Sequence, residues 1–106
     1  MWYVARKTGN ISEDAACAKC RQAIPMEEAR EIFVPRYVIM KKYGATWQEE
    51  RKVLFPGYFF IDAQMPEQVK ERLALLSDFA EPVCVDGEFI PLYEEEQSFL
   101  EVLLGN

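Results

Sequence analysis

The segment 52–61 (KVLFPGYFFI) constrains the fold more than any other part of the chain. It is rich in the aromatic and β-branched residues that are typical of strands. Side chains alternate along a strand, so Tyr58 and Phe60 share one face while Phe59 and Ile61 share the other. Both faces are therefore apolar, which is unusual for a sheet with one side in water. Either helices cover both faces of this sheet, or one face is a binding surface.

A second strand is predicted over residues 31–40 (EIFVPRYVIM), and the polar stretch 41–51 separates it from the first. This pattern predicts a long hairpin with an extended tip. Pro35 and Pro56 each require a strand edge, a bulge or a strand start, because proline has no N–H to give to a ladder. We expect Pro56-Gly57 to mark a kink or a bulge in the second strand, just before Tyr58.

Three amphipathic patterns predict helices over residues 12–25, over 66–76 and from 94 onward. Shorter strands are expected at 2–5 and on both sides of Asp86-Gly87, a strong hairpin signal. The expected order is β-α-β-β-α-β-β-α. This order predicts an α+β fold, in which an antiparallel sheet of about four strands is flanked by three helices.

The composition points to one folded domain, residues 1–106, in which half of the residues are hydrophobic. No apolar run approaches the roughly 18 residues of a membrane span, and the first residues do not have the pattern of a secretory signal. We therefore expect a cytoplasmic protein. The chain has no histidine, which excludes Ser-His-Asp and Cys-His catalytic sites within it. We do not expect an enzyme.

Charge is unevenly distributed along the chain. The net charge is −6, and residues 86–106 contain six acids and no Lys or Arg. Residues 30–52 instead carry six basic residues against three acids. Cations interleaved with Tyr43 and Trp47 combine phosphate contacts with rings on which bases can stack. The candidate nucleic-acid-binding residues of this hairpin are Arg36, Lys41, Lys42, Arg51 and Lys52. A solvated hairpin without a ligand is the alternative.

The three cysteines cannot form a closed disulfide framework. Cys17 and Cys20 have the spacing of a metal or redox pair, but a zinc site needs further ligands, and only Cys84 remains. A thioredoxin-type pair starts a helix, whereas this pair lies within the predicted one. We expect small buried residues here, and no metal or cofactor; redox or metal chemistry is the alternative.

Four short motifs together resemble one known family. The run Phe55–Ile61 (FPGYFFI) resembles the signature of the NusG family of transcription elongation factors. The segments 2–4 followed by Thr8-Gly9, 33–35 (FVP) and 90–92 (IPL) are similar to other landmarks of that family, in the same order. The whole chain resembles the family's N-terminal (NGN) domain. The amino-acid sequence of residues 52–58 most resembles that of specialised LoaP-type antiterminators. The family's C-terminal KOW domain is absent from these residues.

This resemblance implies a non-catalytic transcription elongation or antitermination domain that acts as a monomer. It would bind the clamp helices of RNA polymerase and modulate pausing or termination. The resemblance implies that the polymerase-binding depression contains Tyr58, Phe60, Pro82, Phe99 and Leu103. Ordinary core packing is the alternative for these side chains.

The resemblance also implies two further contacts. Arg6 and Lys7 would join the hairpin cations in binding non-template DNA or an RNA hairpin, and Lys70 and Arg72 would contact the polymerase gate loop. Two other functions stay open: a stand-alone nucleic-acid-binding module that uses the hairpin 36–52, and a small redox or metal enzyme at Cys17 and Cys20.

Overall fold

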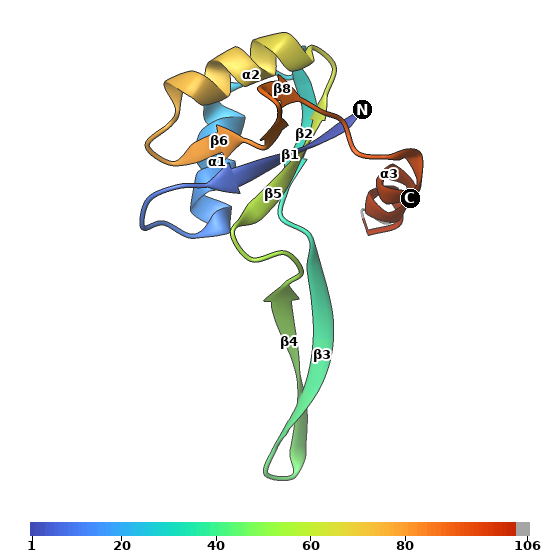
Figure 1. The fold of residues 1–106 in the computed structure, drawn as a ribbon. Helices are drawn as coiled ribbons and strands as arrows, with labels where there is room; N and C mark the ends of the chain where they lie inside the picture. The colour runs from blue at the N-terminus through green and yellow to red at the C-terminus, as the bar shows by residue number, and fades with distance from the viewer. Residues whose placement is uncertain (104–106) are drawn as a thin grey trace.

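In the computed structural model, which describes residues 1–103, a four-stranded antiparallel sheet lies between helices (Figure 1). Its strand order is β2-β5-β1-β6. The strands are β1 (Trp2–Lys7), β2 (Ala29–Phe33), β5 (Tyr58–Ala63) and β6 (Ala80–Pro82). Every pairing in this sheet is antiparallel. The predicted α+β class is confirmed.

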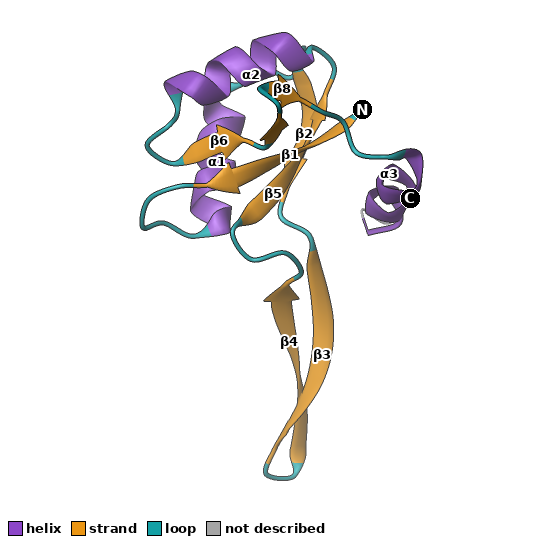
Figure 2. Cartoon of the chain, viewed as in Figure 1, coloured by secondary structure: helices purple, strands orange, loops and turns teal. Residues whose placement is uncertain are grey.

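Helices α1 (Glu13–Ala23) and α2 (Pro66–Leu75) cover one face of the sheet (Figure 2). Ser12 caps α1, because its hydroxyl accepts the N–H of Ala15 at 3.1 Å. The main core lies between these helices and the sheet, where Phe59 and Ile61 are fully buried. Both side chains face this layer, as the alternation along the strand predicts.

The second face of the sheet is covered only in part, by α3 (Glu94–Leu103). Trp2, Phe60 and Leu100 form a second, smaller buried cluster there. The first alternative therefore holds only in part: α3 covers one end of this face, and within residues 1–103 no helix covers the rest. A binding surface on the uncovered part stays a prediction.

Strands β3 (Arg36–Tyr43) and β4 (Thr46–Val53) form a separate two-stranded ribbon that projects from the body (Figure 1). We call residues 36–53 the arm. Its pairing runs without a break from Arg36 opposite Val53 to Tyr43 opposite Thr46. Gly44 takes a φ of +63° in the tight turn at the end, a conformation that favours glycine.

The arm corrects two expectations. Residues 31–40 and 52–61 are not single strands, because Val34-Pro35 separates β2 from β3 and residues 54–57 separate β4 from β5. The polar stretch 41–51 is not a separate tip between two strands either, because most of it belongs to β3 and β4. It forms the outer half of the ribbon, since ladder hydrogen bonds satisfy the backbone while polar side chains stay in water on both faces.

A minimal hairpin joins the sheet to α3. Strands β7 (Cys84–Val85) and β8 (Glu88–Phe89) flank Asp86 and Gly87, whose φ angles are 52° and 79°. Positive φ at both turn residues is typical of the type I′ turn that the Asp-Gly pair predicts. Among the described helices, none has the length and apolarity that crossing a membrane would need.

Candidate docking surface

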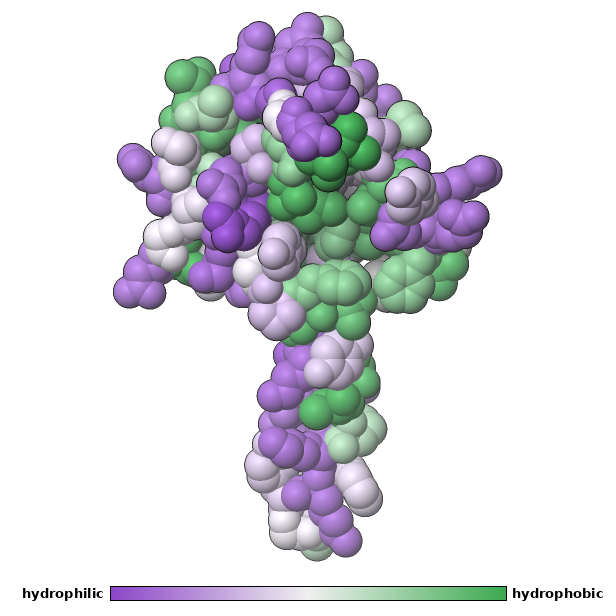
Figure 3. Space-filling model, in the orientation of Figure 1, coloured by the Kyte–Doolittle hydropathy of each residue, from purple (hydrophilic) through white to green (hydrophobic). Residues whose placement is uncertain are grey.

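A hollow of about 410 Å³ lies between α3 and the open part of the second sheet face. We call it the α3 hollow. Figure 3 shows apolar side chains gathered on this side of the body, next to the base of the arm. The apolar residues that line it are Val4, Phe55, Phe60, Leu92, Phe99 and Leu100.

Strand register and one helix position create this hollow. Val4 lies opposite Phe60 in the β1–β5 pairing, so the two side chains share the second face. Phe60 is 6% exposed and forms the floor, whereas Phe55 and Phe99 are 40% and 50% exposed at the sides. The rings of Phe55 and Phe60 meet edge to face, with 5.6 Å between their centroids.

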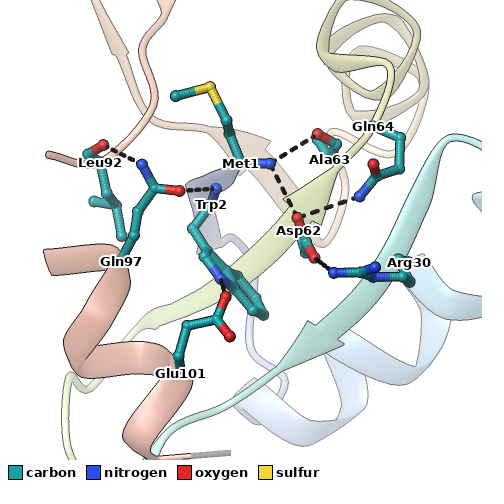
Figure 4. Close-up of polar contacts among 9 residues, drawn as sticks. All are labelled: Met1, Trp2, Arg30, Asp62, Ala63, Gln64, Leu92, Gln97 and Glu101. Atoms are coloured by element: carbon teal, nitrogen blue, oxygen red, sulfur yellow. Dashed lines mark hydrogen bonds and ion pairs between the residues drawn. The ribbon is translucent and has the colours of Figure 1, made fainter. Parts of the chain in front are cut away.

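Hydrogen bonds around Trp2 fix α3 at one side of the hollow (Figure 4). The Trp2 backbone N–H donates to Oε1 of Gln97 at 3.1 Å, and its indole N–H donates to Glu101 at 3.3 Å. Gln97 also donates through Nε2 to the carbonyl of Leu92 at 2.8 Å. The helix is therefore held at Trp2, so that Val4 stays partly exposed in the hollow while Phe60 is buried at its floor.

The predicted polymerase-binding residues fall into two neighbouring places. Phe60 and Phe99 line the α3 hollow. Tyr58 and Pro82 line a second hollow, beside the ion pair of Arg6 with Glu81. Leu103 is the last residue of α3, and its side chain lies outside the described residues.

Two acids stand at the rim of the α3 hollow. Glu95 and Glu96 lie in the first turn of α3 and line the hollow. One oxygen of Glu96 accepts the backbone N–H of Tyr93 at 2.9 Å. Within the described part of the chain, Glu95 makes no hydrogen bond or ion pair, and no basic side chain lines the hollow.

The arm brings most of the predicted nucleic-acid-binding cations together, but its two faces differ. On one face, Glu50 accepts the hydroxyl of Tyr43 and pairs with Lys41 at 3.8 Å and Lys52 at 3.4 Å. The Tyr43 hydroxyl, followed by the two lysines, lowers the pKa of Glu50. On the other face, Nζ of Lys42 lies 5.8 Å from the centre of the Trp47 ring.

The remaining predicted cations lie apart from the outer arm. Arg36 stands at the base of the arm and pairs with Asp14 at 2.6 Å. Lys7 ends β1, and its backbone N–H donates to the carbonyl of Gly57 at 2.8 Å. Arg6, paired with Glu81, is beside Lys7 at the same end of the sheet.

The predicted gate-loop residues already have partners within the chain. Arg72 holds both oxygens of Glu28 at 2.6 Å, and this bidentate bond lowers the pKa of Glu28. Lys70 donates to the carbonyl of Gly87 at 2.7 Å. Both lie on α2, which covers the face opposite the α3 hollow, so the structure does not bring them to that surface.

The cysteine pair is part of the main core. Cys17 and Cys20 are 1% and 0% exposed, and burial raises the pKa of their thiols to about 11 and about 12. No group of three or more possible metal ligands occurs in residues 1–103. The prediction that these cysteines are small buried residues is confirmed.

Sequence reasoning missed several lining residues. Phe55 was visible in the FPGY run, but the run alone does not show that its ring turns toward Phe60. The hollow forms only because α3 packs beside Trp2, and no local sequence pattern predicts that contact. The lining residues that depend on it are Val4, Leu92, Glu95 and Glu96.

The comparison with known families identifies the family of this chain. A family model described as transcription termination factor nusG matches residues 1–100. No curated protein sequence matches at a significant level. The match is to the family as a whole, so the LoaP-type resemblance stays a prediction. Members of this family are non-catalytic transcription elongation and termination factors that interact with RNA polymerase. The chain belongs to the NusG family, as its N-terminal domain.

Proposed function

We propose that this domain docks the α3 hollow onto the clamp helices of RNA polymerase and thereby modulates pausing or termination. The supporting observation is the pair of half-exposed rings, Phe55 and Phe99, on either side of the floor at Phe60. Aromatic side chains around an apolar depression are typical of the centre of a protein interface, where a few residues carry most of the binding energy. Family membership supplies the polymerase as the partner.

The mechanism needs no covalent step. Apolar contacts in the α3 hollow would hold the domain on the clamp, and a second contact would keep the main cleft of the polymerase closed. Arg6, Lys7 and the arm are candidates for contacts with nucleic acid. A contact of Lys70 and Arg72 with the gate loop stays a prediction, since both side chains would have to exchange their present partners.

Binding of the domain to bacterial RNA polymerase tests this proposal. Phe99→Ala and Phe55→Ala remove half-exposed rings, so both variants should stay folded and bind about tenfold or more weakly. Leu75→Ala is the matched control, because Leu75 is 85% exposed on α2, away from the hollow. Folded Phe99→Ala and Phe55→Ala variants that bind as tightly as the wild type would overturn the proposal.

A stand-alone nucleic-acid-binding module is the second candidate. It is favoured by the stacking of Lys42 on Trp47 and by the presence of Arg51 on the same face of the arm. In that case K42E/R51E would abolish nucleic-acid binding, and wild-type binding would fall steeply with salt. The acids of β4 count against it, because Glu50 already pairs with Lys41 and Lys52.

A further inference from the structure

The charges that line the α3 hollow are all of one sign. Its floor and sides are apolar, and the two ionisable side chains that line it are Glu95 and Glu96. The segment that builds this side of the hollow, from residue 86 onward, contains six acids and no basic residue. A partner segment that enters the hollow therefore brings its own groups next to uncompensated negative charge.

Several other carboxylates that the structure describes are bound by groups of the chain itself. Glu13 binds the backbone of Gly57, Glu28 binds Arg72, and Glu101 accepts the indole N–H of Trp2. Glu96 uses one oxygen to hold the N–H of Tyr93, and Glu95 makes no such bond within residues 1–103. Both are exposed at the rim, so their charge is available to a partner.

We propose that the α3 hollow selects a basic amphipathic helix. Apolar side chains of this helix pack against Phe60 and Phe99, while a Lys or Arg on the same helix face pairs with Glu95 or Glu96. Residues three or four apart share a helix face, so an apolar anchor with a cation one turn away meets both parts of the site. The inference rests on the proposed docking to RNA polymerase, and it names the charge that the docking segment carries.

The rim acids predict a salt dependence that an apolar hollow does not. Attraction between exposed charges weakens as ionic strength rises, and it acts mainly on the rate of encounter. Burial of apolar surface alone does not weaken with added salt. Binding through the hollow should therefore become weaker as salt is added, even though the buried contacts are apolar.

The test compares E95Q/E96Q with the wild type in binding to the complete polymerase. Glutamine at position 96 can still accept the N–H of Tyr93, so the first turn of α3 keeps its bond. E27Q/E71Q is the matched control, since it removes the same charge from two exposed acids that do not line the hollow. Binding is measured at ionic strengths with Debye lengths of about 10 Å and about 3 Å.

We expect E95Q/E96Q to weaken binding about fivefold at the lower ionic strength and to flatten its salt dependence, while the control binds like the wild type. A rim variant that behaves like the control overturns the inference. If Phe99→Ala still weakens binding in that case, the docking proposal survives and only the basic partner is excluded. If Phe99→Ala has no effect either, both proposals fail.

Discussion

The carboxylate of Glu13 accepts the backbone N–H of Gly57, with 2.9 Å between Oε2 and the nitrogen. Glu13 begins α1, and Gly57 lies in the turn that leads from the arm into β5. The next residue of α1, Asp14, pairs with Arg36, the first residue of β3. The first turn of α1 therefore contacts both the first residue of β3 and the turn that follows β4, at the base of the projecting arm (Figure 1).

Replacing Glu13 should loosen the arm. In Glu13→Ala the N–H of Gly57 loses its acceptor, which should lower the free energy of unfolding by about 1 kcal/mol. Residual dipolar couplings of the arm amides should also shift relative to those of the main sheet. Glu13→Gln is the control for the couplings, because its amide oxygen can accept the same N–H. Unchanged couplings in Glu13→Ala would show that the arm is oriented by other contacts.

The same bond predicts a pH dependence of stability. The Gly57 N–H, with smaller contributions from Lys7 and Arg36, lowers the pKa of Glu13 below its usual value of 4.5. A carboxyl with a lowered pKa stabilises the fold above its unfolded pKa, and this contribution is lost as pH falls through the folded value. Wild type should therefore be more stable than Glu13→Gln at neutral pH, and the difference should shrink below about pH 4.5. Denaturant unfolding at a series of pH values measures it; a difference independent of pH would contradict the assignment.

The sequence predicts a helix or a hairpin well where a cap, an apolar stripe or a turn pair lies within the element itself. The cap at Ser12 and the stripe of Ala16, Cys20 and Ile24 locate α1, and Asp86-Gly87 locates the last hairpin. The arm was harder to predict. A segment that pairs first with one strand and then with another keeps the same alternation of side chains, so the sequence pattern does not show where the partner changes. Residues 31–40 have one continuous pattern, yet the part before Pro35 pairs with β5 and the part after it pairs with β4.

The site was predictable only in part, for a related physical reason. Phe60 and Phe99 could be proposed from their apolar patterns and the resemblance, whereas Glu95 enters the hollow through the docking of α3 onto Trp2. Arg72 shows the opposite case. Its position on a helix surface suggests a free cation, but Glu28, 44 residues away, binds both arms of its guanidinium. The spacing of residues along the sequence does not predict an ion pair between side chains so far apart in the chain.

Removing the bonds of Gln97 should release α3 from the sheet. Gln97→Ala deletes both the acceptor of the Trp2 N–H and the donor to the Leu92 carbonyl. We expect hydrogen exchange of the α3 amides to accelerate about tenfold, while α1 and α2 stay protected, because local opening needs less free energy than global unfolding. Ser98→Ala, at an exposed neighbouring position, is the control. Equal protection of α3 in both variants would mean that apolar contacts at Leu100 hold the helix alone.

Thiol labelling tests the remaining alternative, a redox or metal function for the cysteine pair. The thiolate is the reactive form, and burial raises the pKa of Cys17 and Cys20 to about 11 and about 12. In the native protein at neutral pH, an alkylating reagent should therefore modify the half-buried Cys84 and leave the other two intact; all three should react after unfolding. Mass spectrometry counts the labels, and Cys84→Ser should abolish native labelling. If Cys17 or Cys20 were labelled as fast as Cys84, the pair would be accessible and ionised, and a buried structural role could not account for that reactivity.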